Sequence, residues 1–259
     1  MNAQTTSRFE PMTIGMILDT TVRLYLHNFS LMIGITALAY LPYLILLLVS
    51  TFVASLQGQN ATVFAVVGVG TSLLWFLIAQ PLSIGAATYA ISERYLHRQS
   101  SALDAIQAAW KRYSTLLGAQ CVAGLVIAGG FMLFIIPGTR WMLSYALIGP
   151  AVILETGNAK ESRQRSWSLV AGHRKKVFGV MLVVWVLTFV VTAAVQATLG
   201  LLLGLESVSG QLVTQAITQL ASYVVIPFAI IANVLLYYDL RMRKEGFDLE
   251  MLSLALSRQ

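Results

Sequence analysis

The residues that most often carry catalysis or bind metals are few in this chain. Its one cysteine is Cys121, and its three histidines are His27, His97 and His173. No two histidines have the spacing of a metal-binding helix, and neither a Gly-x-Ser-x-Gly elbow nor a phosphate-binding glycine loop occurs. A single cysteine also excludes a disulfide framework and a cysteine-based zinc site. We therefore expect no catalytic residue, no metal site and no cofactor, and hence a protein that is not an enzyme.

Three short amphipathic segments share a different pattern, in which an aromatic residue follows an acidic residue six positions later. The segments are 17–25, 102–110 and 159–167. An acid in a first helical turn complements the helix dipole, and Ser101 with Asp104 fits a capping box. The aromatic residue suits the headgroup layer of a membrane. The repeated pairs are Asp19 with Tyr25, Asp104 with Trp110, and Glu161 with Trp167.

Clusters of basic residues give the chain a second kind of chemistry, the binding of anionic lipid headgroups. Each basic residue near a membrane surface contributes about 1 kcal/mol to such binding. Because orientation in a membrane also requires basic residues on the cytoplasmic side, the clusters do not indicate nucleic acid. We expect anionic membrane lipids on the cytoplasmic side as partners, a membrane protein as a second kind of partner, and no nucleic acid. The candidate lipid contacts are Arg174, Lys175, Lys176, Arg241, Arg243 and Lys244.

Prolines and amides are the helix-breaking and polar groups expected inside the membrane. A proline leaves the carbonyl four residues earlier without its N–H donor, and an amide nearby can satisfy that carbonyl. We favour this role for Gln80 and Asn233 over contact with a substrate. A polar stripe over 211–222 is expected at headgroup depth, with the mouth of an outward-facing cavity as the alternative. The candidate residues inside the membrane are Gln80, Pro81, Pro150, Pro227 and Asn233.

Membrane-spanning helices must position these residues, because the composition fits no other class. Of 259 residues, 57% are hydrophobic and 11% charged, and the mean hydropathy is +0.75. Soluble domains carry about 25% charged residues, and a crossing helix needs about 20 apolar residues. Stretches without charge predict an all-α integral membrane protein with six transmembrane helices. The expected spans are 30–56, 61–91, 114–137, 141–155, 177–203 and 212–238.

The basic residues also predict the orientation of the chain. With six spans, every Lys and Arg except Arg140 faces the cytoplasm, whereas many would face outside if 141–155 did not cross. We therefore expect both termini in the cytoplasm and one membrane domain over 1–259. It consists of three hairpins, each preceded by a cytoplasmic interfacial amphipathic helix. The approximate repeats are 13–96, 100–156 and 157–246, followed by a surface helix over 248–256.

Three parts of the chain can be compared with known families, namely 134–138 with 150–155, 165–172 and 236–250. Together they resemble a known bacterial membrane family. They resemble the polytopic domain that some proteins carry fused to a glycerophosphodiester phosphodiesterase. The resemblance implies a stand-alone, multi-pass protein of the bacterial inner membrane. In the fused relatives the chemistry belongs to a separate soluble barrel of about 250 residues, for which this chain has no room. No catalytic residue is therefore carried over.

Two classes of function remain open from the sequence. We favour a non-enzymatic accessory or scaffold protein of the envelope, which binds lipid or a partner protein through its interfacial helices. The alternative is a transporter or lipid scramblase with a cavity between the hairpins. An intramembrane enzyme is the least favoured class, because no nucleophile–base pair or metal-binding constellation is visible.

Overall fold

The computed structural model describes residues 11–56, 61–96, 98–155, 157–203 and 208–245. Within these ranges every regular element is helical and no strand occurs, so the all-α prediction is confirmed. The surface helix expected over 248–256 lies outside the described residues.

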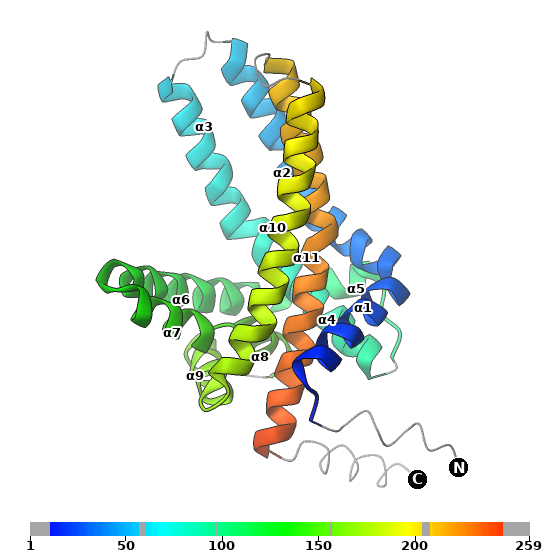
Figure 1. Ribbon diagram of the computed structural model, residues 1–259, viewed down its shortest axis with the longest axis vertical. Coiled ribbons are helices and arrows are strands. Elements are labelled where there is room, and N and C mark those ends of the chain that lie inside the picture. The colour runs from blue at the N-terminus through cyan, green and yellow to red at the C-terminus, as the bar shows by residue number, and fades with distance from the viewer. Residues whose placement is uncertain (1–10, 57–60, 97, 156, 204–207, 246–259) are drawn as a thin grey trace.

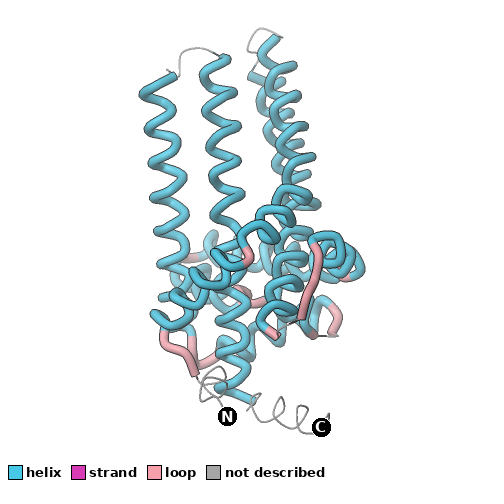
Figure 2. Tube along the Cα trace, turned by 90° about the vertical axis from the view of Figure 1, so that its right-hand side faces the viewer, coloured by secondary structure: helices cyan, strands magenta, loops and turns pink. Residues whose placement is uncertain are grey.

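Four long helical segments run along the longest axis of the molecule (Figures 1 and 2). They are α2 (Phe29–Leu56), α10 (Arg174–Leu203), α11 (Val208–Glu245) and a continuous helix made of α3, a π-helical segment and α4. The bounds of that continuous helix are α3 Ala61–Leu74, π segment Trp75–Ala79 and α4 Gln80–Tyr95. We call the half that holds the end of α2 and the start of α11 the distal half, and the opposite half the proximal half.

Five helical stretches are long and apolar enough to cross a membrane. They are Phe29–Ser50, Gly68–Tyr95, Tyr113–Leu133, Arg174–Leu202 and Val213–Glu245. These stretches coincide with five of the six expected spans, so the chain has the helices of a multi-pass membrane protein.

The fourth expected span, 141–155, does not form one helix, and this prediction is wrong. It is divided between α7 (Ile135–Ser144) and α8 (Ile148–Leu154), each far shorter than the about 20 residues that a crossing needs. The preceding helix, α6 (Tyr113–Leu133), packs against α7 as a hairpin. This hairpin lies across the direction of α10 and α11 in Figure 1.

The three expected amphipathic segments all lie in helices. These helices are α1 (Ile14–His27), α5 (Ala102–Lys111) and α9 (Ala159–Val170). The predicted capping box of Ser101 and Asp104 is present, and Asn158 with Glu161 forms a second one. Asp19 differs, because α1 is capped by Thr13 and Asp19 lies in the middle of that helix.

The hydrophobic core lies in the proximal half, where α11 meets α1, α2, α4, α8 and α9. Its central residues are Ile17 of α1, Ile91 of α4 and Leu235 of α11, all fully buried. In the distal half α3 packs on α2, α2 on α11, and α11 on α10. Apolar side chains such as Val66 and Phe189 are exposed there, as expected for a surface that faces lipid.

Candidate functional sites

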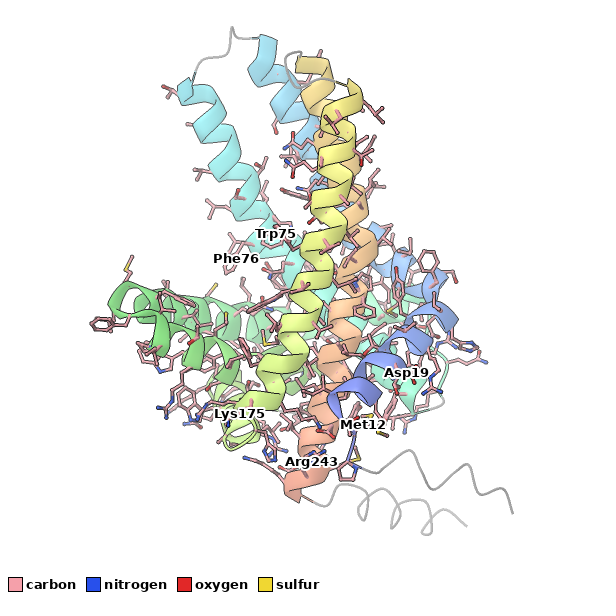
Figure 3. The ribbon with its side chains drawn as sticks, in the orientation of Figure 1. Met12, Asp19, Trp75, Phe76, Lys175 and Arg243 are labelled. Carbon is pink, nitrogen blue, oxygen red and sulfur yellow. The ribbon has the colours of Figure 1, made fainter. Side chains whose placement is uncertain are left out.

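A buried carboxylate at the proximal end of α11 joins three segments of the chain. Asp239 is fully buried, and its Oδ1 accepts the backbone N–H of Met12 at 2.7 Å. Its Oδ2 accepts from Lys176 of α10 and from Nε of Arg243, the latter at 3.0 Å. Lys176 and Arg243 also donate to the carbonyl of Met12. Figure 3 shows Met12 and Arg243 at this end of the molecule. The cluster fixes the entry of the chain into α1.

A second ionic cluster is centred on Arg165 of α9. Its Nε donates to both carboxylate oxygens of Glu155, at 2.8 and 2.9 Å, and its Nη2 donates to Glu245 at 2.7 Å. Tyr237 donates to Glu155, and Arg241 donates to Glu245 at 3.2 Å. The hydrogen bonds to Glu245, followed by those to Glu155, raise the pKa of Arg165 above its ordinary value against the opposing effect of burial. This guanidinium is therefore a permanent cation that ties α9 to the ends of α8 and α11.

The break between α7 and α8 is stabilised by a serine of α9. Ser166 is fully buried, donates to the carbonyl of Ser144 at 2.8 Å and accepts the N–H of Leu147 at 3.1 Å. These are backbone groups that a continuous helix would have paired within itself. The serine thus compensates for the interruption of the expected fourth span.

Asn233 satisfies a carbonyl that a proline frees, although the proline is not its neighbour in sequence. Its Nδ2 donates to the carbonyl of Ala146 at 2.9 Å. Ala146 lies four residues before Pro150, whose nitrogen has no hydrogen to donate. The amide of Asn233 has the backbone role favoured above, but it serves Pro150 of α8 rather than the nearby Pro227.

Tyr113 has the corresponding role at Pro81. The carbonyl of Leu77, four residues before Pro81, accepts the Tyr113 hydroxyl at 2.5 Å. The π-helical segment with Trp75 and Phe76 (Figure 3) comes immediately before this proline. The Oε1 atom of Gln80 is buried and has no hydrogen-bond partner among the described residues. The sequence therefore indicated the need for a donor but named Gln80 instead of Tyr113.

The aromatic residues of the repeated pairs differ in their surroundings. The Tyr25 hydroxyl donates to the carbonyl of Val224 on α11 at 2.7 Å. Trp110 is 62% exposed and stacks on Tyr113, while Trp167 packs on Tyr145 and under the guanidinium of Arg174. Asp19, with Arg23 at 2.5 Å, lies on the exposed side of α1 (Figure 3).

The six candidate lipid contacts differ in the bonds that they make within the protein. Lys176, Arg241 and Arg243 are in the ion pairs described above, so each has an anionic partner within the protein. Lys244 donates to the carbonyl of Ser168. Lys175 is exposed and Arg174 is half-buried near the start of α10. Figure 3 shows Lys175 at the proximal end.

A polar groove between α10 and α11 is a further candidate site. Its volume is about 510 Å³, and all the residues that line it are uncharged and polar. Among them, the hydroxyls of Thr214 and Thr218 are buried and have no partner among the described residues. Each hydroxyl would therefore gain a hydrogen bond from a water or ligand group that reached it. The lining residues are Thr192, Gln196, Thr214, Gln215, Thr218, Gln219 and Ser222.

The height of this groove can be compared with that of the neighbouring helices. With a rise of 1.5 Å per residue, Thr214 lies roughly 9 Å and Ser222 roughly 21 Å along α11 from Val208. The distal ends of α2 and α3 reach a similar height in Figures 1 and 2, and the segments 44–56 and 61–74 contain no charged residue. A bilayer that covers these apolar ends also covers the groove. For the polar stripe over 211–222, the comparison therefore favours the mouth of an outward-facing cavity over a position at headgroup depth.

Among the described residues, no group of three or more His, Cys, Asp or Glu side chains could hold a metal ion. The architecture is that of a helical, multi-pass membrane protein. A family described as a domain of unknown function, DUF7847, matches residues 112–240, which is just under half of the chain. No curated protein and no solved structure matches this chain. The matched range contains Arg165, Ser166, Asn233 and Asp239, and it ends before Glu245.

Proposed function

We propose that this protein is a non-enzymatic lipid-binding accessory protein of the bacterial cytoplasmic membrane. In this proposal both termini lie in the cytoplasm and the distal half faces outward. The observation that carries the proposal is the polar groove between α10 and α11 with its two unpaired hydroxyls. In the proposed orientation this groove lies at the depth of the acyl chains. Unpaired hydroxyls are costly in a bilayer because hydrocarbon offers no hydrogen bonds. A groove with two such hydroxyls is therefore suited to a polar group brought in by an amphiphile.

The chemistry of the groove favours a neutral headgroup. Thr, Ser and Gln side chains donate and accept hydrogen bonds, but no Lys or Arg is among the described residues that line the groove and could neutralise a phosphate. A headgroup rich in hydroxyls, such as the glycerol of a diacylglycerol or a sugar, matches this set. Its acyl chains would extend over the exposed apolar side chains of α10, for example Phe189 and Val190.

Anionic lipid on the cytoplasmic side is a separate part of the proposal. Lys175 and Arg174 bond to no described carboxylate or carbonyl, unlike the other four candidates, so they are the best placed of the six to contact such headgroups. A membrane protein partner remains compatible with this assignment. We also propose that this chain is related to the membrane domain of glycerophosphodiester phosphodiesterases. Such a relation implies no activity for this chain.

Lipid translocation is the alternative function, and the polar groove is also the observation that favours it. The groove lining extends from Thr214 to Ser222, roughly 12 Å along α11, whereas the hydrocarbon layer is about 30 Å thick. Beyond Ser222, towards the proximal half, α11 continues with Tyr223, Val224 and Val225. A polar path therefore covers less than half of a crossing, which favours binding over passage.

Lipid binding to the groove can be measured by native mass spectrometry. Protein in nanodiscs is titrated with a monoglucosyl diacylglycerol and, in parallel, with phosphatidylglycerol. We expect the double variant Thr214→Val/Thr218→Val to bind the glucolipid roughly tenfold more weakly, because two hydrogen bonds of about 0.5–1.5 kcal/mol each are lost. Binding of phosphatidylglycerol should not change.

The control is Thr188→Val, since the Thr188 hydroxyl bonds to the carbonyl of Val184 in its own helix, outside the groove. Equal glucolipid binding by the double variant and this control would refute the groove as the site. Flux of fluorescent lipid in proteoliposomes distinguishes the alternative. Translocation by the wild type that the double variant loses would assign a scramblase instead of a binding protein.

A further inference from the structure

The hairpin of α6 and α7 is oriented differently from the other apolar helices. Figure 1 shows it extending sideways from the bundle, and the view turned by 90° in Figure 2 shows no segment of similar length rising beside the four long ones. Its two helices are antiparallel neighbours joined at Phe134. After α7 the chain is therefore at about the same height along the long helices as at the start of α6.

The tip of this hairpin is a strongly exposed apolar surface. Met132, Phe134 and Ile136 are 88%, 76% and 80% exposed. No charged residue lies between Arg112 at the base of α6 and Arg140 in α7. A contiguous surface of this kind marks contact with lipid or with another protein.

Two hydrogen bonds determine the height of the hairpin. Tyr113, the first residue of α6, bonds to Leu77, which lies 16 residues or roughly 24 Å along its helix from Ala61. Ala146, just after α7, bonds to Asn233, which lies 25 residues or roughly 37 Å from Val208. The hydrocarbon layer is about 30 Å thick and the whole bilayer about 40–45 Å. Measured from the distal ends, the hairpin therefore lies at the proximal boundary between acyl chains and headgroups.

Close packing makes the hairpin a preformed unit. A methyl group added at Gly130 would lie 2.5 Å from the ring of Trp141, and one added at Gly138 would lie 2.5 Å from the ring of Phe131. The two helices approach one another closely at these glycines. By contrast, a methyl group at Gly129 would meet no atom within 4 Å.

We propose that α6 and α7 form an in-plane hairpin that inserts its apolar tip, residues 131–136, among the acyl chains of the proximal leaflet. Four segments then cross the membrane, namely α2, the α3–α4 helix, α10 and α11. Acyl chains are the occupant that the structure favours, because the hairpin lies at the boundary where they begin and its tip belongs to a stretch without charge between Arg112 and Arg140. An in-plane hairpin also removes the need for 141–155 to cross. All basic residues can then face one side, including Arg140.

The topology is tested with single cysteines in a Cys121→Ala background. The three reporters are Lys111→Cys, Arg140→Cys and Lys175→Cys, all at exposed positions. A membrane-impermeant maleimide is added to spheroplasts and to inverted vesicles. We expect all three cysteines to react from the same side. Reaction of the residue at 140 from the opposite side would show that α6 and α7 both cross. Reaction at 111 from the side opposite to the other two would show that α6 alone crosses.

Insertion of the tip is tested with a bimane label on Phe134→Cys in vesicles of phosphatidylglycerol and phosphatidylcholine. Bromine atoms on the acyl chains should quench this label at least twofold, while the same label on Lys175→Cys should not be quenched. Gly130→Ala should reduce the quenching by separating the two helices, and Gly129→Ala should not. A label that is unquenched by brominated lipid, with crosslinking between cysteines at 134 of two copies, would instead assign the tip to a dimer interface.

Discussion

The buried carboxylate of Asp239 leads to the most direct test of the folded structure. In Asp239→Asn the side chain keeps one oxygen that can accept the N–H of Met12, but the negative charge between Lys176 and Arg243 is lost. Breaking a buried ion pair by removing one partner costs about 3–5 kcal/mol. Here the side chains of Lys176 and Arg243 are 14% and 30% exposed, so both can turn partly towards water. We therefore expect a loss near the lower limit, about 3 kcal/mol.

The matched control makes the same chemical change at an exposed position. Asp19 and Arg23 form an ion pair one helical turn apart, with side chains 64% and 74% exposed. Such pairs contribute about 0.3–0.5 kcal/mol. Asp19→Asn should therefore lower stability by no more than about 0.5 kcal/mol.

The free energy of unfolding is measured in mixed micelles by titration with SDS, with the five tryptophans as the fluorescence signal. A double variant separates the lost attraction of the Lys176–Asp239 ion pair from the cost of leaving the Lys176 ammonium without a carboxylate partner. Lys176→Met removes the ammonium that Asp239→Asn leaves unpaired, so combining the two should recover at least about 1 kcal/mol relative to additivity. Similar stabilities for Asp239→Asn and Asp19→Asn would refute the assignment of a buried ionic cluster.

Three further variants test local contacts. Tyr113→Phe should cost roughly 1–2 kcal/mol in the same titration, because the carbonyl that Pro81 frees loses its donor. In a Pro81→Ala background this cost should fall below about 0.5 kcal/mol. Gly85→Ala should lose about 1–3 kcal/mol, since the new methyl group would lie 2.9 Å from a methyl group of α5, whereas Gly70→Ala enters open space and should be neutral or stabilising. Hydrogen bonds from Ser101 hold the pKa of Asp104 below its ordinary 3.8. The stability difference between wild type and Asp104→Asn should be complete above that pH and disappear as pH falls through the lowered pKa.

Hydropathy and helix-capping patterns predicted the parts of the fold that depend on local sequence. The positions of five apolar helices follow from charge-free stretches, and Ser101 with Asp104 indicated the start of α5 correctly. The six-residue spacing of Asp19 and Tyr25 matched the other two pairs, yet Asp19 does not cap α1. A spacing between two side chains does not fix the position of either within a helix. The structural difference follows from Thr13, which caps α1 six residues before Asp19.

The wrong prediction for 141–155 has a physical cause that composition cannot reveal. The segment carries no charge before Glu155, but Pro150 prevents one helical hydrogen bond, and carbonyls at the break find donors on distant helices. Ser166 lies 22 residues after the carbonyl it satisfies, and Asn233 lies 87 residues after its own acceptor. A proline in an apolar segment together with an amide elsewhere was the available signal. It could not show which amide serves which proline.

The ionic network explains why the sequence stretches of the family resemblance carry so little information about activity. Glu155 belongs to the stretch 134–138 with 150–155. Arg165 and Ser166 belong to 165–172, and Asp239 belongs to 236–250. In the structure Glu155 bonds to Arg165, Ser166 bonds to the broken backbone between α7 and α8, and Asp239 bonds to Lys176 of α10. These bonds join α8, α9, α10 and α11 at the proximal end. The ion pairs and hydrogen bonds of these side chains stabilise the fold. The hydroxyls of the distal groove, the apolar tip of the hairpin and the exposed Lys175 lie outside this network, so experiments on function should begin there.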